Sequence, residues 1–367
     1  MPSNSVMSER PTRVLYVIHD ARRGGVQSVM LRVIAALDRK RVEPTVMFPF
    51  DGPCARELRQ QGVRVIAVGR QTPFFWRLKR FSMMPRLLKL AKQADIVHLN
   101  SVKLAIPSLA VSLFGGRGRT VFHLHELPGK IGPLLRAAMR RADCAAFCSQ
   151  TCADHFFDVG AQKRAVLINA LPLPDREVKT QTGGLPKIVM LGSINHGKGQ
   201  DLLLDGFALV REQAELHFYG NVGLSARGYV RRLKEQAART GVASRVFFHP
   251  PTDDVAGLLA ETALLVHTSR RESFGMVLIE AMAAAVPVIA NDLGGMREVV
   301  ADGVTGYLVE PGNPALLASR IDELLADPRL RQEMGDAGRQ RVRERFDIAM
   351  RIEDYHKLYQ QLNGRER

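Results

Sequence analysis

Two glutamates, Glu272 and Glu280, are separated by seven residues within an otherwise apolar stretch, ESFGMVLIEAMAAAVPVIA. Burying a carboxylate among apolar side chains is costly unless a partner meets it. Carboxylates that accept hydrogen bonds from hydroxyl groups are what a sugar or a ribose requires, so this spacing suggests a sugar-containing ligand. The alternative is that Glu272 pairs with Arg270 or Arg271 and that Glu280 meets a buried partner.

The residues between the two acids predict the start of a helix. Ser273 can cap this helix. The N–H groups around Phe274, Gly275 and Met276 would then point out of the helix end toward an anion, and Gly275 keeps that approach free of a side chain. Because helical side chains lean toward the N-terminus, Glu280 can face the same ligand as the first acid.

Glycines occur in two loops that each precede a helical pattern. Gly24 and Gly25 would let a ligand approach the backbone at a helix N-terminus, although a tight turn explains the pair equally well. Gly192 opens the corresponding loop of the second half, where further glycines surround Lys198. A compact positive charge at a helix start suits a diphosphate, and the alternative is an ordinary solvated lysine.

Short apolar runs alternate with longer helical patterns, twice over, on either side of a Pro-, Gly- and Thr-rich stretch at residues 170–186. This alternation predicts an α/β fold of two Rossmann-like domains, each with a parallel sheet covered on both faces. Their facing strand ends are expected to form a deep cleft. The pattern is helical from residue 313 onward. The predicted strands are 13–19, 45–50, 63–68, 95–99 and 120–125, then 187–191, 215–220, 245–249, 263–267, 287–290 and 306–309.

The chain is strongly basic, with 52 Lys and Arg against 37 Asp and Glu and a pI near 10.1. Such a charge favours a nucleic acid, an anionic membrane surface or a phosphorylated small molecule. The sequence contains no zinc, RNP or helix-turn-helix signature, and nucleic-acid binding would leave the two glutamates without a role. A nucleic-acid partner is therefore not expected.

The compartment is predicted from the N-terminus and the cysteines. The N-terminus lacks the apolar stretch of a secretory signal, and no run reaches the roughly eighteen apolar residues that span a bilayer. Cys144, Cys148 and Cys152 are spaced by fours, but their segment predicts a buried strand running into a helix, with the cysteines as small buried residues. A cytoplasmic protein is therefore expected.

The motifs of the second half, taken together, resemble the nucleotide-sugar domain of glycosyltransferase family 4, a family of retaining group 1 glycosyl transferases with the GT-B fold. GKG at 197–199, the two glutamates, DLGG at 292–295 and DGVTGYLV at 302–309 follow one another in the family's order.

The resemblance also implies a domain organisation. The N-terminal, acceptor-binding domain would comprise residues 1–170, and the nucleotide-sugar-binding domain residues 183–347. A C-terminal helix, about 348–367, would cross back onto the N-terminal domain.

The resemblance implies roles for the residues around the two acids. Glu280 would accept hydrogen bonds from the ribose, and Glu272 from the donor sugar. Phe274, Gly275 and Met276 would line the sugar and the diphosphate.

Further roles are implied nearer the reacting atoms. Lys198 would neutralise the departing diphosphate, and His125, in HLHE, would lie near the reacting sugar carbon. A hydrogen-bonded structural histidine is the alternative for His125. Gly24 and Gly25 would lie beside the diphosphate and the acceptor. No cofactor and no metal are expected, since Asp253 and Asp254 form an adjacent pair that suits a helix cap rather than a D-x-D motif.

One position departs from the family pattern. The family carries an arginine a few residues before the lysine, where this chain has Ser193. His196 or Arg271 could substitute for that arginine. A catalytically weak protein that binds sugar nucleotides is therefore one alternative to a transferase. A GT-B nucleotide-sugar epimerase, which would share the fold, is another.

The acceptor side is predicted from residues 70–93, which interleave Lys and Arg with aromatic residues and Met and contain Trp76, the only tryptophan. Such a segment suits an anionic bilayer surface, and the alternative is an amphipathic helix packed on its own sheet. The expected reaction transfers a sugar from a nucleotide sugar, with UDP-sugars favoured over GDP-mannose. The acceptor would be a glycan or a polyprenyl-diphosphate-linked glycan of bacterial surface polysaccharide synthesis. The protein would then be peripheral on the inner face of the cytoplasmic membrane.

Overall fold

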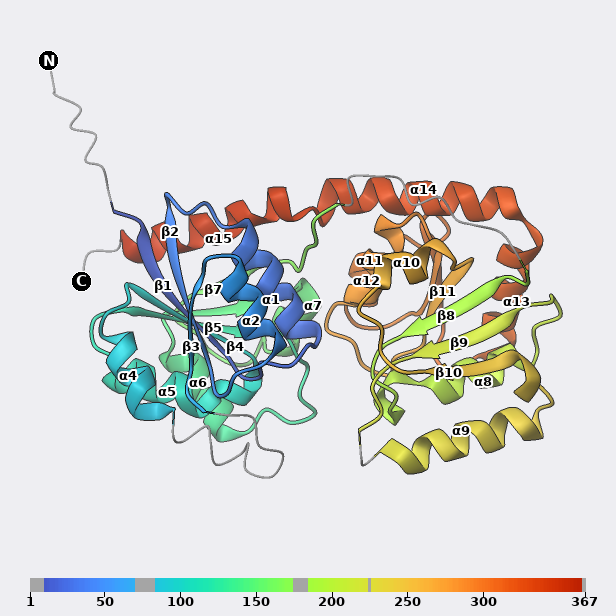
Figure 1. The fold of residues 1–367 in the computed structure, drawn as a ribbon, viewed down its shortest axis with the longest axis horizontal. Coiled ribbons are helices and arrows are strands. Elements are labelled where there is room, and N and C mark those ends of the chain that lie inside the picture. Colours follow the sequence, from blue (N-terminus) through green and yellow to red (C-terminus); the bar gives the residue numbers. More distant parts are fainter. Residues whose placement is uncertain (1–9, 70–82, 174–183, 224–225, 365–367) are drawn as a thin grey trace, which may run out of the picture. The chain divides into compact units, whose positions relative to one another are not determined.

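The structure is a computed structural model that describes residues 10–69, 83–173, 184–223 and 226–364 (Figure 1). The chain divides into two compact units. Unit 1 comprises Met1–Asn169 and Ile348–Arg367, and unit 2 comprises Ala170–Asp347.

Unit 1 contains a seven-stranded parallel sheet in the order β3-β2-β1-β4-β5-β6-β7. Its central strands are almost entirely buried, which explains their near-continuous apolar sequences. The strand order reverses between β1 and β4, and ligands of such sheets bind at the carboxyl ends of the strands at this reversal. The strands are β1 Thr12–Ile18, β2 Val42–Phe48, β3 Arg64–Ala67, β4 Ile96–Asn100, β5 Arg119–Leu124, β6 Cys144–Phe147 and β7 Arg164–Val166.

Seven α-helices are described in unit 1. Helix α1 contacts α2 and α15, and α15 also contacts β1 and β4. Helix α5 contacts both α4 and α6, so these three helices form a second contiguous layer. The C-terminal helix thus packs on the N-terminal sheet, as predicted (Figure 1). The helices are α1 Gly25–Ala36, α2 Pro53–Gln60, α4 Met84–Ala91, α5 Ala105–Phe114, α6 Pro133–Arg141, α7 Gln150–His155 and α15 Ile348–Asn363.

Unit 2 contains a six-stranded parallel sheet in the order β10-β9-β8-β11-β12-β13, which reverses between β8 and β11. Phe207, Phe218 and Ile321 belong to the core of unit 2. The strands are β8 Lys187–Leu191, β9 Glu215–Tyr219, β10 Val246–His249, β11 Leu264–His267, β12 Val288–Asn291 and β13 Gly306–Val309. The helices are α8 Gln200–Phe207, α9 Arg227–Arg239, α10 Val255–Ala260, α11 Met276–Ala283, α12 Met296–Val299, α13 Pro314–Ala326 and α14 Pro328–Arg345.

The predicted fold class, α/β with two Rossmann-like sheets, is confirmed. Each predicted strand is present with its ends displaced by at most three residues. Asp254 caps α10 by accepting a hydrogen bond from the Gly257 N–H, and Cys144, Cys148 and Cys152 are buried, both as predicted. Cys54, for which no prediction was made, is also buried. Strand β7, which has only three residues, was not predicted.

The basic aromatic segment predicted at 70–93 lies partly outside the described residues, and Trp76 is among those not described. Its described part contains α4, in which Leu87 and Ala91 are buried and Arg86 and Lys89 are exposed. This part therefore buries its apolar side chains within unit 1 and exposes its cations.

Candidate functional site

Glu272 forms an ion pair with Lys198. Its Oε2 atom accepts a hydrogen bond from Lys198 Nζ at 2.7 Å and lies 3.0 Å from His267 Nε2. Burial alone would raise the pKa of the Glu272 carboxyl, but the charge of Lys198 and the bond from His267 outweigh burial and hold that pKa well below its ordinary value. The ordinary-lysine interpretation of Lys198 is therefore wrong, and so is the pairing of Glu272 with Arg270, which instead pairs with Asp201.

The DLGG motif holds the backbone of Glu272. The Gly295 N–H donates to the Glu272 carbonyl at 2.9 Å, and a Cβ at Gly295 would collide with the Ser273 carbonyl. Gly294 has φ +56° and would collide with the Glu272 carbonyl if it carried a side chain. The two glycines therefore allow the loops after β11 and β12 to lie against each other.

The turn that carries Lys198 is fixed to the same loop. Gly199 has φ +74°, and a Cβ there would collide with the Thr268 carbonyl, so glycine is required. The Thr268 hydroxyl donates to the Gly199 carbonyl at 2.8 Å, and the Arg270 N–H donates to the Gly197 carbonyl at 2.9 Å. Lys198 and Glu272 thus come from the carboxyl ends of β8 and β11, the strands between which the order reverses.

Arg270 lies against the turn that carries Lys198. Its guanidinium donates to the His196 carbonyl at 2.7 Å and pairs with Asp201 at 2.7 Å. Burial opposes ionisation of Asp201, but Arg270 and the Tyr229 hydroxyl outweigh it and lower the pKa of Asp201 to about 2. His196 and Arg271 had been the predicted substitutes for the arginine missing at Ser193. The Arg270 charge is already neutralised by Asp201, so Arg270 chiefly braces the turn.

The helix start differs from the prediction. Helix α11 begins at Met276 with Gly275 as its N-cap residue and no side-chain cap, so the predicted cap by Ser273 is wrong. Gly275 has φ +105°, and this left-handed turn separates Ser273 from the first helical N–H groups. The Phe274 side chain is buried against Phe346, with ring centroids 5.6 Å apart, so only its backbone can face a ligand.

Glu280 is half-buried rather than deeply buried. It lies one helical turn after Met276 and Val277, which are also half-buried, whereas Leu278 and Ile279 face the core. Met276, Val277 and Glu280 therefore form a partly accessible strip of α11, which the apolar sequence around Glu280 did not predict.

His125 lies at the carboxyl end of β5 and is 6% exposed. Its ring centroid is 4.0 Å from that of His123. His123 Nδ1 lies 3.2 Å from His98 Nε2, and His98 Nδ1 lies 2.7 Å from the Tyr359 hydroxyl. That hydroxyl in turn lies 2.8 Å from the hydroxyl of Tyr16, so a hydrogen-bonded chain connects α15 to the neighbour of His125.

His98 and His123, the two histidines within this series of hydrogen bonds, are neutral. Burial lowers the pKa of His98 to about 3 and also lowers the pKa of His123. The sequence did not predict this series of hydrogen-bonded side chains, although the alternate histidines of HLHE at the end of a strand were a signal.

The first glycine pair is not required by the backbone. Gly24 is the N-cap residue of α1 and is extended, with φ −177°. A Cβ at Gly25 would meet no atom within 4 Å, and one at Gly24 would meet only the Gln27 side chain. The tight-turn explanation therefore does not account for the pair.

The loop after β4 has an unusual conformation. Ser101 is not glycine but has φ +110°, and its hydroxyl donates to Glu126 at 2.6 Å. Glu126 also accepts from the Val102 N–H at 3.2 Å. Backbone strain of this kind costs about 1–3 kcal/mol and collects at functional sites. Ser101 lies one residue beyond the end of β4, beside the strand reversal of unit 1.

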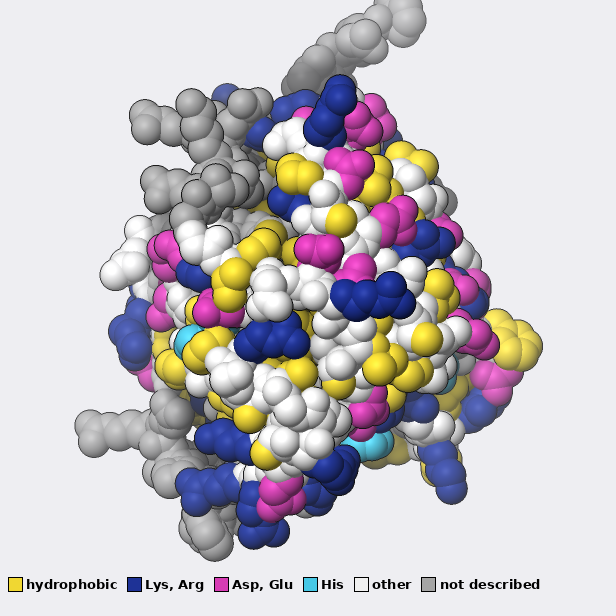
Figure 2. All heavy atoms as spheres, turned by 90° about the vertical axis from the view of Figure 1, so that its right-hand side faces the viewer, with side chains coloured by type: hydrophobic (Ala, Val, Ile, Leu, Met, Phe, Trp, Pro, Cys, Tyr) yellow, Lys and Arg dark blue, Asp and Glu magenta, His cyan; other side chains and the backbone are white. Residues whose placement is uncertain are grey.

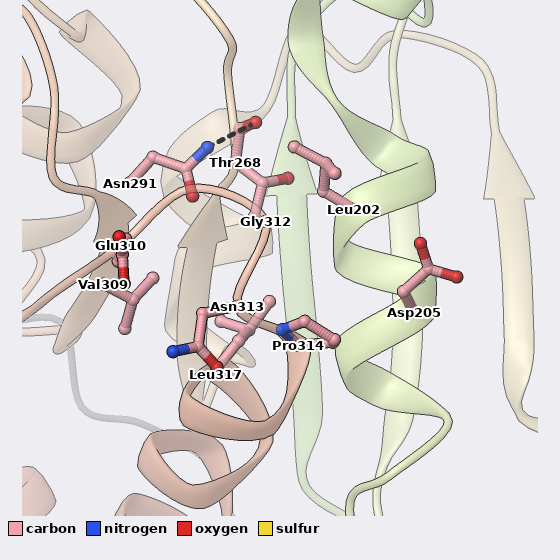
Figure 3. A pocket seen from close by; sticks show the side chains of 10 residues that line it. All are labelled: Leu202, Asp205, Thr268, Asn291, Val309, Glu310, Gly312, Asn313, Pro314 and Leu317. Atoms are coloured by element: carbon pink, nitrogen blue, oxygen red, sulfur yellow. Dashed lines mark hydrogen bonds between the residues drawn. The ribbon is translucent and has the colours of Figure 1, made fainter.

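A cavity of about 130 Å³ lies between α8 and α13 in unit 2 (Figure 3). It is lined by Asp205 and Glu310 and by no Lys, Arg or His. Asn291 donates to the Thr268 carbonyl at its edge. Because its charged side chains are acidic, this cavity does not suit a diphosphate.

The described residues contain neither a metal-ligand cluster nor a membrane-spanning helix. Within the described ranges, no group of three His, Cys, Asp or Glu side chains could hold a metal ion. The described helices include none that is both long enough and apolar enough to cross a bilayer.

Two curated relatives and one solved structure are similar to this chain. N-acetyl-alpha-D-glucosaminyl L-malate synthase of Bacillus anthracis is 41% identical over 118 residues, which cover 32% of this chain and 31% of that protein. The chain thus spans about a third of that relative. The GDP-mannose-dependent alpha-(1-6)-phosphatidylinositol monomannoside mannosyltransferase of Mycolicibacterium smegmatis is 28% identical and covers 87% of this chain and 90% of its own length. Anabaena Alr3699/HepE, in complex with UDP and glucose, superimposes with a TM-score of 0.83 at 22% identity, covering 95% of this chain and all of its own.

Two family models match consecutive parts of the sequence. Glycosyltransferase Family 4 matches residues 23–170, and Glycosyl transferases group 1 matches residues 174–341. On these matches, which lie on the two Rossmann-like units in turn, the chain belongs to the group 1 glycosyl transferases of family 4.

Proposed function

We propose that this chain is a retaining, metal-independent glycosyltransferase that moves a sugar from a nucleoside-diphosphate sugar to a glycan or lipid-linked acceptor. The observation that carries the proposal is the Lys198–Glu272 ion pair at the strand reversal of unit 2. It places a fixed positive charge next to a carboxylate, at the edge of the sheet where parallel α/β sheets bind their ligands.

Lys198 stabilises the departing diphosphate. Loss of the nucleoside diphosphate builds negative charge on the phosphate oxygens, and a preorganised cation lowers the barrier because its position costs nothing at the moment of reaction. Glu272 holds the Lys198 ammonium in place beforehand, at 2.7 Å. The N-terminus of α11, whose N-cap residue Gly275 has no side chain, supports the same charge.

Glu272 also has an oxygen for the sugar. Both of its short contacts fall on Oε2. We assign Oε1 to hydroxyls of the donor sugar, and the backbone of Phe274, Gly275 and Met276 to the sugar and diphosphate. Glu280, on the accessible strip of α11, accepts hydrogen bonds from the ribose.

Unit 1 contributes His125 and the open N-terminus of α1. His125 lies near the reacting sugar carbon, held against neutral His123. Gly24 and Gly25 admit the diphosphate and the acceptor to the helix end. The acceptor hydroxyl attacks the face from which the diphosphate leaves, so the anomeric configuration is retained and no carboxylate nucleophile is needed.

The donor is a UDP-sugar, with GDP-mannose as the second candidate. The structure of Anabaena Alr3699/HepE, which contains UDP and glucose, supports the first, and the name of the Mycolicibacterium relative supports the second. The acceptor is a glycan or a polyprenyl-diphosphate-linked glycan of bacterial surface polysaccharide synthesis. The protein then works in the cytoplasm, peripherally on the inner face of the membrane.

The test is a screen of nucleotide sugars for thermal stabilisation, followed by incubation of each hit with water or model acceptors. A transferase releases nucleoside diphosphate and gives a product of unchanged anomeric configuration by NMR. An epimerase would instead convert the donor to its epimer without an acceptor, and a binding protein would be stabilised without turnover. Lys198→Met should strongly slow the release, whereas Lys187→Met, which breaks a comparable 2.7 Å pair with Glu261 at the opposite edge of the sheet, should not.

A further inference from the structure

The helical layer of α4, α5 and α6 is basic and carries no acid. Residues 84–141 contain ten Lys and Arg but only two Asp and Glu. Neither acid lies on these helices: Asp95 pairs with Arg10 and Arg13, and Glu126 accepts from the Ser101 hydroxyl. More than half of the net charge of the chain thus arises in this segment.

The same layer exposes large apolar side chains. Ile106, Leu113 and Phe114 of α5 are 41%, 44% and 64% exposed, and Leu134 of α6 is 43% exposed. Ile106 and Leu113 are seven residues apart, so they lie on one face of α5. A soluble amphipathic helix presents polar residues on its outer face, and α5 does not.

Basic residues occupy the same end of the layer as Phe114, the most exposed of these residues. The stem of Lys92 lies beside Gly116, two residues after Phe114, since a Cβ there would be 3.2 Å from Lys92 Cγ. Arg117 follows, and Arg140 and Arg141 end the adjacent α6. Among the described residues none of these four cations forms an ion pair with Asp or Glu, so their charge is available to a partner.

Helix α9, the basic helix of unit 2, differs from this layer because its large apolar side chains are buried. Helix α9 carries exposed Arg231, Arg232 and Arg239, but its apolar residues Tyr229 and Leu233 face the core. Figure 2 shows unit 2 from the side, and on this face Asp and Glu side chains are scattered among Lys and Arg. Basic charge combined with exposed apolar side chains and without acids is the property of the α4–α5–α6 layer.

We propose that the outer face of α4, α5 and α6 is a membrane-contact surface, and that its partner is a bilayer rich in anionic lipid. The Leu113 and Phe114 side chains enter the headgroup region, and the surrounding cations pair with lipid phosphates. A second copy of the chain is a poorer partner, because two such faces would bring uncompensated positive charges together.

This surface suits the proposed reaction, on which the choice of a membrane partner rests. Helices α5 and α6 begin at the carboxyl edge of the sheet, and the loop into α6 starts at His125. Ile106 and Leu134 lie in the first turns of these helices, so the apolar face extends to the edge that carries His125. An acceptor sugar on a membrane lipid would therefore be delivered to the edge of unit 1 where the reaction takes place.

The experiment is cosedimentation of the full chain with vesicles of phosphatidylglycerol and phosphatidylcholine, compared with phosphatidylcholine alone. We expect binding only to the anionic vesicles, weakening as salt rises, since charge is screened over about 10 Å at 0.1 M salt. The triple variant Arg117→Gln, Arg140→Gln, Arg141→Gln should bind about a hundredfold more weakly, at roughly fivefold per charge. Leu113→Ser with Phe114→Ser should also reduce binding.

The matched control removes the same charge from α9: Arg231→Gln, Arg232→Gln, Arg239→Gln. Equal losses in the two triple variants would overturn the proposal, since bulk charge would then explain the binding. So would an absence of vesicle binding by the unaltered chain. Dimers in sedimentation velocity that Leu113→Ser with Phe114→Ser abolishes would identify the face as a contact between copies instead. No donor is present in these measurements, so their outcome is separate from that of the transferase assay.

Discussion

The Lys198 ammonium lies 2.7 Å from the Glu272 carboxylate although 74 residues separate them in the sequence. The parallel pairing of β8 with β11 brings the two loops together. His267, at the end of β11, lies 3.0 Å from the same carboxylate oxygen. The cation assigned to the diphosphate is therefore positioned before a ligand arrives, and its removal should affect the reaction more than the binding of the sugar.

Replacing Lys198 with Met should lower kcat by about 100- to 1000-fold, the usual loss when one preorganised group that stabilises a leaving charge is removed. Donor KM should change far less. Steady-state release of nucleoside diphosphate checks this, with Lys187→Met as the control. Equal losses in the two variants would show that the effect is one of stability alone.

Replacing Glu280 with Ala should weaken binding of free nucleoside diphosphate by about 1–3 kcal/mol, because charge-assisted hydrogen bonds to the ribose are lost. Calorimetric titration measures the change. Glu261→Ala, at the other edge of the sheet, should leave the affinity unchanged. A folded Glu280→Ala variant with normal affinity would exclude a ribose contact.

The contribution of Glu272 to stability should depend on pH. Because its folded-state pKa is depressed, the carboxylate stabilises unit 2 fully above its unfolded pKa of about 4.3, and that stabilisation is lost as the pH falls below this value. The free energies of unfolding of the original chain and of Glu272→Gln, measured in urea, should therefore differ at pH 7 and converge toward pH 3. A constant difference would contradict the ion pair.

The buried histidines give a second pH dependence with a different window. His98 has a pKa of about 3 in the folded chain and about 6.5 when unfolded, so only the unfolded state takes up a proton between these values. Each pH unit below about 6.5 should cost unit 1 about 1.4 kcal/mol from this group. His98→Gln should flatten the slope of unfolding free energy between pH 6 and 4.

Replacing Tyr359 with Phe should destabilise unit 1 by about 1–3 kcal/mol, because His98 Nδ1 and the Tyr16 hydroxyl lose their shared partner. Tyr355→Phe is the matched control, since its buried hydroxyl has no hydrogen-bond partner among the described residues. It should be close to neutral. If His123 also positions His125, Tyr359→Phe should lower kcat while Tyr355→Phe does not.

A last expectation concerns metals. In the proposed function, Lys198 and the start of α11 would supply the positive charge that a divalent ion supplies in other transferases, so turnover should persist in EDTA. Recovery of lost activity on adding manganese would require a different assignment of the leaving-group charge.

The local sequence pattern predicted the strands and the fold class well, but it predicted the side-chain contacts of the site less well. The alternation of apolar runs located the strands because a buried parallel strand needs a continuous apolar sequence. The three residues of β7 are too few to show such a pattern, and they lie at the sheet edge. The partner of Glu272 could not be read from neighbouring residues, because it depends on which strands lie side by side.

Backbone conformation limited the site prediction in the same way. Ser273 is a good cap residue by type, but the positive φ of Gly275 moves the helix start beyond its reach. Phe274 was expected at a ligand, yet Phe346, far along the chain, covers its ring. The chain of His98 and Tyr359 joins residues 261 positions apart, which no local motif reports.

The discontinuous make-up of unit 1 has a consequence for biosynthesis. Its last helix, α15, follows the whole of unit 2, so the ribosome must translate Ala170–Asp347 before Tyr359 exists. At 5–20 residues per second this takes roughly 10–35 s, during which the emerged N-terminal sheet lacks the helix that covers β1 and β4. The N-terminal unit begins to form first but is completed last, and in that interval it is the part of the nascent chain that chaperones or proteases would meet.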